Sequence, residues 1–168
     1  MKEVNIREME LNPINLIGGQ WWLITAGSAE RGWNTMTASW GHLGTIWGNN
    51  MPTAVVYIRP QRYTKEFVDR EDTFTLSVLP EKYRKALGIL GTKSGRDGDK
   101  VAEAGLTPVF SEDGVYFEEA DLVFVCRKVY HAPIKEEGFV DRSIIDDHYP
   151  TRDFHEMYIG EITKVLEK

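Results

Sequence analysis

Short runs of β-branched and aromatic residues, each ended by glycine, proline or another turn residue, recur along most of this chain. Runs of this kind are typical of strands, and the turn residues between them favour antiparallel neighbours. Residues 72–79 also alternate polar with apolar side chains at a period of two, as a strand with one face in a core does. The strands that we predict span residues 21–27, 33–40, 53–58, 72–79, 115–117, 120–130 and 156–165.

Helical patterns are few and brief. We predict helices at residues 63–69, 81–90 and 101–104, and loops at 41–51 and in the glycine-rich stretch 91–100. The first fifteen residues are interpreted as an arm or edge segment, and residues 139–154 give no readable pattern. Many short strands with a few short helices predict a mainly β, α+β fold, in which the strands form a closed or partly closed barrel.

Length and composition fit one domain with its own core, because the chain has 168 residues and 42% hydrophobic content. No apolar run approaches the roughly 18–20 residues that span a bilayer, and the first residues lack the apolar core of a secretory signal. We therefore expect a soluble, cytoplasmic protein.

Composition and motifs exclude several functional classes. The single cysteine, Cys126, rules out an intrachain disulfide and multi-cysteine metal sites, and its place in an apolar run predicts a packed core thiol. The net charge of −6 argues against a nucleic-acid binder. The glycine spacings of a P-loop and of a Rossmann site are both missing, as is a Gly-x-Ser-x-Gly elbow.

Residues 34–40, Asn-Thr-Met-Thr-Ala-Ser-Trp, form the first candidate binding segment. The Asn34 amide and the hydroxyls of Thr35, Thr37 and Ser39 are donors and acceptors that suit a heterocycle with carbonyls and ring nitrogens. On a strand, alternate side chains face opposite ways, so all of them reach one ligand only if the strand twists or the backbone contributes. The alternative is that this is an ordinary Thr/Ser-rich strand.

Residues 59–64, Arg-Pro-Gln-Arg-Tyr-Thr, form the second candidate segment, at the end of a predicted strand. Arg59 and Arg62 flank a proline turn, and Thr64 begins a helix whose free N–H groups and dipole attract an anion. Residues 59–100 hold ten Lys/Arg against seven Asp/Glu, so positive charge gathers in this part of an acidic chain. These two segments together predict a planar, phosphorylated ligand, although both arginines have nearby acidic residues with which they could pair.

Two further groups of residues bear on ligand and metal binding. Ser94 and the following glycine offer backbone amides to an anion, with Lys93 or Lys100 as point charges. The four histidines, His42, His131, His148 and His155, are widely spaced, and we expect no metal site from them.

The order of these segments resembles the flavin reductase-like, FMN-binding split-barrel family, and in particular its flavoredoxin-type members. The resemblance covers roughly residues 18–165 and includes the segments 22–27, 34–40, 59–64, 74–79, 94–100 and 155–162. It implies a single domain over residues 1–168, with an arm at 1–15 and a split barrel of antiparallel strands at about 16–165. It also implies a homodimer with one non-covalent FMN per subunit near the interface.

The resemblance assigns roles to residues of this chain. Residues Asn34, Thr35, Met36, Thr37, Ser39 and Trp40 would line the flavin ring and ribityl chain. The phosphate would be held by Arg59, Arg62, Tyr63 and Thr64 and closed in by Lys93, Ser94 and Lys100. His155 lies near the flavin in some relatives, and no other catalytic residue is expected because the flavin itself carries the chemistry.

Three functions remain open at this point. The first is an oxidoreductase that takes electrons from NADH or NADPH onto FMN and passes them to a flavin, an iron centre or a protein. The second is a flavin-binding electron carrier without direct NAD(P)H activity. The third, a pyridoxamine-phosphate-oxidase-like enzyme, would need a pyridoxal phosphate pocket that the sequence does not reveal.

Overall fold

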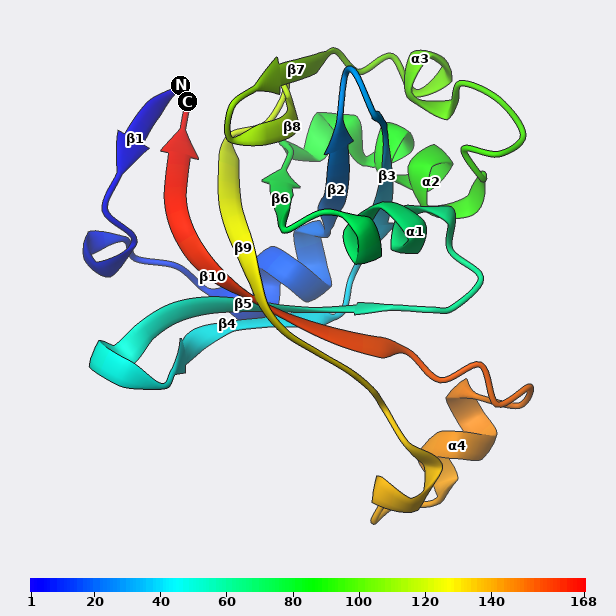
Figure 1. Ribbon diagram of the computed structural model, residues 1–168. Coiled ribbons are helices and arrows are strands. Elements are labelled where there is room, and N and C mark those ends of the chain that lie inside the picture. The colour runs from blue at the N-terminus through cyan, green and yellow to red at the C-terminus, as the bar shows by residue number, and fades with distance from the viewer.

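Eight strands form one antiparallel sheet in the computed structural model, which describes residues 1–168 (Figure 1). The strand order is β3-β2-β6-β9-β10-β5-β4, and β1 adds to the free end of β10. These strands are β1 Lys2–Val4, β2 Trp22–Ser28, β3 Gly32–Ala38, β4 Gly41–Ile46, β5 Met51–Ile58, β6 Thr73–Val78, β9 Leu122–Pro133 and β10 Glu156–Glu167. A separate hairpin joins β7 Pro108–Ser111 to β8 Gly114–Phe117. The prediction of a mainly β, antiparallel fold is confirmed.

The sheet curls but does not close. Its two end strands, β3 and β4, follow one another in the chain with only Ser39 and Trp40 between them, yet they do not pair. The barrel is therefore split between these strands, and β3 keeps one edge free of strand partners.

One predicted loop is a strand. Residues 41–51 contain glycines and polar residues that read as a turn, but Gly41–Ile46 forms β4 and pairs with β5 from the register Gly41↔Val56 to Ile46↔Met51. The loop prediction was wrong because pairing with the strongly β-forming β5 overrides the weak propensity of Gly-His-Leu-Gly.

Four helices accompany the sheet. They are α1 Tyr63–Arg70, α2 Arg84–Thr92, α3 Lys100–Ala104 and α4 Ser143–His148, with short 3₁₀ turns at Ile6–Glu8, Gly48–Asn50, Glu81–Tyr83 and Glu136–Gly138 and a wide helical turn at Asn15–Gln20. α1 packs on one face of β2 and β3 through Phe67 and Val68, whereas α2 and α3 cover the opposite face. Figure 1 shows α4 at the far end of the long β9 and β10. None of the helices is long and apolar enough to cross a membrane.

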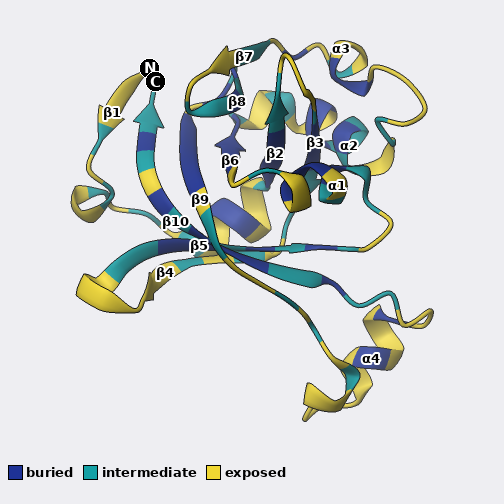
Figure 2. Cartoon of the chain, viewed as in Figure 1, coloured by how far each residue is buried: buried dark blue, intermediate teal, exposed yellow.

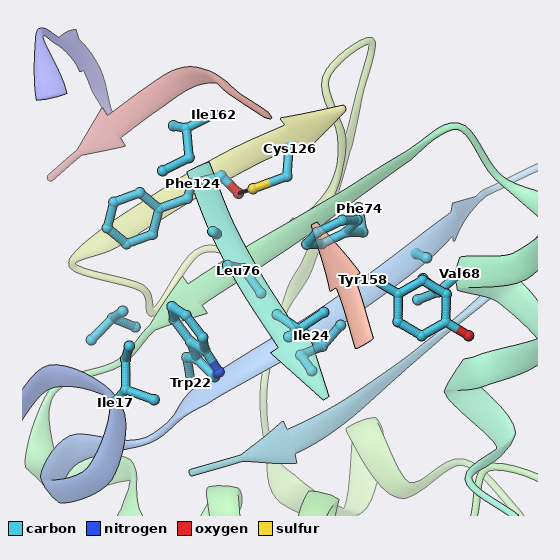
Figure 3. Close-up of a cluster of buried hydrophobic side chains, with 14 of the residues drawn as sticks. Ile17, Trp22, Ile24, Val68, Phe74, Leu76, Phe124, Cys126, Tyr158 and Ile162 are labelled. Atoms are coloured by element: carbon cyan, nitrogen blue, oxygen red, sulfur yellow. Dashed lines mark hydrogen bonds between the residues drawn. The ribbon is translucent and has the colours of Figure 1, made fainter. Parts of the chain in front are cut away.

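The core consists of two layers of buried side chains. The inner layer lies within the curled sheet, where Trp22, Ile24, Leu76 and Phe124 are fully buried (Figure 3). Cys126 belongs to this layer and is fully buried, which confirms the prediction of a packed core thiol. The outer layer packs α2 and α3 against β2 around Leu23, Leu87, Leu90 and Val101.

Two extensions project from this core. Figure 2 shows exposed residues at the tip of the β4–β5 hairpin and over most of α4, in contrast to the buried central strands. Residues 139–154, for which the sequence yields no structural prediction, contain α4. Ile145 and Tyr149 are the buried residues of this segment. This segment returns the chain to His155 and the start of β10.

Candidate functional site

A cavity of about 200 Å³ lies at the split in the barrel. It is bordered by the end of β3, the end of β5 and the residue before β10. Its lining residues are Met36, Thr37, Ala38, Ser39, Trp40, Tyr57, Arg59, Arg62 and His155. We call it the Trp40 pocket. It brings together the two segments that the sequence singled out, which lie about twenty residues apart in the chain.

The β3 side of the Trp40 pocket is an open strand edge. β3 pairs only with β2, so backbone N–H and C=O groups on its other edge have no strand partner. Ser39 and Trp40 continue from this edge, and the Trp40 side chain remains 43% exposed. Residues 34–36 are buried, whereas residues 37–39 are partly exposed and Trp40 is exposed, so the accessible part of this segment is its second half.

Arg59 lies at the end of β5 and is already paired. Its Nη1 donates to Asp153 Oδ2 at 2.6 Å, and its Nη2 donates to the His148 carbonyl at 2.9 Å. Gln61 Nε2 donates to the same Asp153 oxygen at 2.7 Å. The pKa of Asp153 is strongly lowered by the hydrogen bonds from Gln61 and Arg59. Arg59 therefore lines the pocket with much of its charge neutralised.

Arg62 lies on the other side of the proline turn and makes no ion pair with a carboxylate. Its Nη1 donates to the Gly91 carbonyl at 2.8 Å, at the end of α2. Burial lowers the pKa of this guanidinium. A partly buried cation that is held by carbonyl oxygens keeps its positive charge available for an anion.

Lys100, the first residue of α3, reaches the same end of α2. Its ammonium is buried and donates to the carbonyls of Leu90 and Lys93, both at 3.2 Å. Burial, together with the charge of Arg62, lowers the pKa of Lys100 to about 8. Two cations thus converge on one helix end without a carboxylate between them.

A second cavity of about 280 Å³ lies beside Lys100 and the buried Asn34. Asn34 Nδ2 donates to Thr64 Oγ1 at 2.8 Å, which joins β3 to the first turn of α1. The loop at Gly95 passes so close that a Cβ atom there would meet Asn34 Oδ1 and lie 3.2 Å from the Tyr63 ring. Only glycine allows this approach of the loop to Asn34.

Seven predicted site residues do not line the Trp40 pocket. Asn34 and Lys100 line the second cavity, and Thr64 is buried and bonded to Asn34. The remaining four make other contacts. The Thr35 side chain lies in the buried layer facing β2, where its hydroxyl shares a 2.8 Å hydrogen bond with that of Thr25 and donates to the Ile24 carbonyl at 3.2 Å. Thr35 is fully buried, so we correct its assignment: the structure does not expose it to a ligand. The others are Tyr63, whose ring lies under the Arg96 guanidinium, Lys93, which pairs with Glu103, and Ser94, which accepts from the Arg96 backbone N–H.

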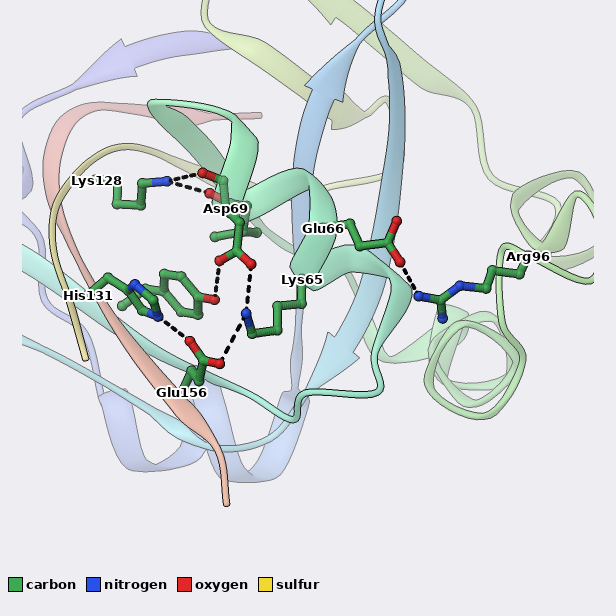
Figure 4. Close-up of polar contacts among 9 residues, drawn as sticks. Lys65, Glu66, Asp69, Arg96, Lys128, His131 and Glu156 are labelled. Carbon is green, nitrogen blue, oxygen red and sulfur yellow. Dashed lines mark hydrogen bonds and ion pairs between the residues drawn. The ribbon is translucent and has the colours of Figure 1, made fainter. Parts of the chain in front are cut away.

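A polar cluster on the far side of α1 is separate from the pocket (Figure 4). Asp69, His131 and Glu156 each place one donor atom within 4.8 Å of the others, a spacing that could hold a metal ion. Lys65 already supplies a cation there, because its ammonium lies 2.6 Å from Asp69 and 3.1 Å from Glu156. This cluster ties α1 to β10, and we assign it no ligand.

The donor set of the Trp40 pocket and its surroundings fits an anionic ligand with a flat ring. Two cations stand at the end of α2, an open strand edge offers hydrogen bonds, and the exposed indole of Trp40 offers an apolar face. Comparison with family models gave one match, the flavin reductase like domain, over residues 15–168. The chain belongs to the flavin reductase-like family.

Solved structures related to this flavin reductase-like chain share its fold. One is the FMN-binding domain of a flavin reductases-like enzyme from Shewanella baltica, with 16% identity, a TM-score of 0.69 and coverage of 98% of this chain and 75% of that one. Another is flavoredoxin of Desulfovibrio vulgaris, with 22% identity, a TM-score of 0.67 and coverage of 100% and 77%. A third is nitrilotriacetate monooxygenase component B from Bacillus cereus, with 18% identity, a TM-score of 0.65 and coverage of 98% and 80%. No protein with a curated description matched the sequence.

Two residues of this flavin reductase-like site were missed from the sequence. Tyr57 lines the Trp40 pocket, and it was detectable, because it stands two positions before Arg59 on a strand and so shares a face with it. Tyr149 contacts the pocket residue His155 from the segment 139–154, and no local pattern connects the two.

Proposed function

We propose that this protein binds FMN non-covalently at the Trp40 pocket and passes electrons from NADH or NADPH to an acceptor. The observation that supports it most is the placement of Arg59 and Arg62 in one cavity with Trp40, at the split of a barrel of the flavin reductase-like family. Structural neighbours that are described as an FMN-binding domain and as flavoredoxin agree with this proposal.

In this proposal, Arg62 and Lys100 hold the phosphate. Both are partly or wholly buried cations without a carboxylate partner, whereas Lys93, Arg59 and Arg96 are each paired with an acidic residue. Lys100 lines the cavity beside Asn34, together with Asp99, and Arg62 lines the Trp40 pocket. Arg59 assists from the other side of the proline turn.

The free edge of β3 holds the ring system. Backbone groups along the accessible residues 37–40 match the carbonyls and ring nitrogens of a flavin, and the side chains of Thr37 and Ser39 lie at the same edge. The Thr37 hydroxyl donates to the Leu87 carbonyl at 2.6 Å, which fixes the strand against α2. Trp40 covers the ring from one side and keeps water away from it.

FMN when bound would supply the redox chemistry, and the protein needs only to bind, orient and shield it. The acceptor is a free flavin, an iron centre or a protein. A cytoplasmic location stays a prediction, which cell fractionation would test. We name no general base, because electron transfer through a flavin does not need one from the chain.

Anaerobic reduction of the FMN-loaded protein tests this function. The absorbance of bound flavin near 450 nm should disappear on addition of NADH or NADPH in a few-fold excess. Flavin that stays oxidised with both nucleotides and is bleached only by dithionite would contradict the reductase and support the electron carrier.

We also propose that two copies of the chain associate over an apolar groove of about 740 Å³ that adjoins the Trp40 pocket. The groove and the Trp40 pocket share the lining residues Ser39, Trp40 and Tyr57. Ile14 is 82% exposed and Ile144 is 40% exposed at this groove, a large cost for a single copy in water. A second copy would cover them and shield the flavin.

Sedimentation velocity tests the dimer. The wild-type protein should sediment with twice the chain mass of 19.2 kDa, and Ile14→Asp should shift it toward the monomer. Val140→Asp is the matched control, because Val140 is fully exposed and does not line the groove. A wild-type monomer at tens of micromolar would contradict the dimer.

A further inference from the structure

Tyr149 and His155 form a buried polar pair beside the Trp40 pocket. The Tyr149 hydroxyl lies 2.8 Å from His155 Nδ1. Tyr149 is 4% exposed and His155 is 8% exposed, so water does not readily replace either residue as the hydrogen-bond partner of the other. The pair joins the segment that follows α4 to the start of β10, and it brings a residue from outside the predicted site into contact with a residue that lines it.

The surroundings of Tyr149 fix the direction of this hydrogen bond. The hydroxyl has no other side-chain or carbonyl acceptor within reach. If His155 Nδ1 carried a proton and donated it, the Tyr149 proton would be buried without an acceptor, at a cost of about 1–3 kcal/mol. Tyr149 therefore donates to Nδ1. The pKa of Tyr149 is raised chiefly by its burial.

The charged groups around His155 keep its ring neutral. Burial, followed by the nearby charge of Arg59, lowers the pKa of His155 to about 4, and Asp153 opposes this only in part. A neutral ring carries one proton, and since Nδ1 accepts from Tyr149, that proton is on Nε2.

His155 Nε2 has no hydrogen-bond partner in the protein. Nδ1 is the only ring atom of His155 that makes a hydrogen bond, and Nε2 is not among the polar atoms sealed from solvent. The ring lines the Trp40 pocket and packs against the Trp40 indole at a centroid distance of 5.0 Å. The Nε2–H group of His155 is thus free to bind a ligand in the Trp40 pocket.

We propose that Tyr149 is a positioning residue, which locks His155 in the Nε2–H tautomer so that the imidazole presents a neutral hydrogen-bond donor to the ligand of the Trp40 pocket. A neutral donor suits a carbonyl oxygen or an unprotonated ring nitrogen of a planar heterocycle. The identity of that heterocycle as FMN rests on the proposed function, whereas the tautomer does not depend on it.

Nuclear magnetic resonance of the ligand-free protein, labelled with ¹⁵N-histidine, tests the tautomer directly. Wild-type His155 should show one protonated nitrogen, Nε2, and Tyr149→Phe should show both neutral tautomers in exchange. The Phe ring keeps the packing of Tyr149 against Phe154 and Phe139 and the contact with Arg59, so only the hydroxyl is removed. A wild-type ring protonated at Nδ1, or an unchanged tautomer in Tyr149→Phe, would overturn the proposal.

Titration with FMN tests the donor role. FMN should shift the His155 Nε2–H resonance and leave that of His131, which stacks on Tyr158 in the separate polar cluster, in place. Tyr149→Phe should weaken FMN binding about three- to tenfold, as expected for one misplaced hydrogen bond. His155→Gln, which can place an amide N–H near the Nε2 position, should retain more affinity than His155→Leu.

Tyr158→Phe is the matched control, because it also removes a buried tyrosine hydroxyl, one that donates to Asp69 at 2.6 Å, and it lies outside the pocket. It should leave both the His155 tautomer and FMN affinity unchanged. Equal weakening in Tyr149→Phe and Tyr158→Phe would overturn the donor role. If no variant and no wild-type protein binds FMN, the proposed function fails, while the tautomer measurement still decides the role of Tyr149.

Discussion

Arg62 and Lys100 donate hydrogen bonds to adjacent carbonyls at the end of α2, Arg62 to Gly91 at 2.8 Å and Lys100 to Leu90 at 3.2 Å. They come from different parts of the chain, one before α1 and one at the start of α3. The charge of Arg62 acts against that of Lys100, and an anion beside both would offset this repulsion. This relationship is the basis for placing a phosphate here.

Arg62→Gln should weaken FMN binding more than Arg59→Gln does. A charge-assisted contact contributes about 1.5–3 kcal/mol, so the loss at Arg62 should be about tenfold or more. Arg59 should matter less, because Asp153 already neutralises it at 2.6 Å. Flavin fluorescence titration measures both, with a thermal melt to show that each variant is folded.

Arg127→Gln is the control for these two variants, since Arg127 is an exposed arginine whose guanidinium pairs with Glu161 on the neighbouring strand. It should leave the affinity unchanged. An Arg62→Gln protein that binds FMN as tightly as Arg127→Gln does would remove Arg62 from the phosphate site.

FMN affinity should fall between pH 7 and pH 9. Lys100 has a pKa lowered to about 8, so it loses its charge in this interval, whereas a phosphate with a second pKa of about 6 keeps a constant charge. The dissociation constant of the wild-type protein should rise up to about tenfold. Lys100→Met should bind FMN weakly at every pH in this interval, without the pH dependence of the wild type. The same pH dependence in both proteins would assign the titration to another group.

Acid should destabilise the fold through His155. The pKa of His155 is about 4 in the folded protein, below the ordinary value of 6.5, so the unfolded chain binds more protons between these values. The free energy of unfolding therefore falls as pH drops from 6.5 to 4, by about 2 kcal/mol from this residue. Urea denaturation at pH 7 and pH 4.5 should show a smaller difference for His155→Gln than for the wild type; equal differences would contradict the assignment.

Gly160→Ala should destabilise the barrel. A Cβ atom at Gly160 would lie 2.7 Å from Phe74 Cζ and 2.8 Å from Cys126 Cβ, and both residues are buried in the inner layer. Overpacking of this kind typically costs about 1–3 kcal/mol. Gly44→Ala is the matched control, since Gly44 is also in a strand but has no neighbour within 4 Å. Urea denaturation should separate the two, and equal stability would show that the core relaxes around the added methyl group.

Local patterns were enough to predict most strands and the two segments that meet in the Trp40 pocket. Residues 72–79 alternate polar with apolar side chains and form β6, but both faces of β6 are buried, because Thr75 and Ser77 are as inaccessible as Leu76. Arg59 follows the clear strand pattern of β5, so both strands were readable from local sequence. The strand β4 was not, because its Gly41 and Gly44 carry no β signal and its pairing with β5 supplies the stability.

The sequence did not reveal which face of a strand each side chain occupies, nor which residues distant in the chain are in contact. Thr35 was expected to reach a ligand, but its position on β3 turns it toward Thr25 in the buried layer. The pairing of Arg59 with Asp153 and the contact of Tyr149 with His155 depend on how residues 139–154 fold back. The spacing of residues along the chain does not indicate where a distant segment folds back against another.

Titration of the purified protein with FMN, followed by visible absorption and by quenching of tryptophan fluorescence, is the most direct test of the binding site. The wild-type protein should bind one FMN per chain, with a flavin spectrum that differs from that of free FMN and with quenching that is reduced in Trp40→Leu. A protein that gives no flavin spectrum after incubation with excess FMN and removal of the unbound part would contradict the site assignment and leave only the split barrel established.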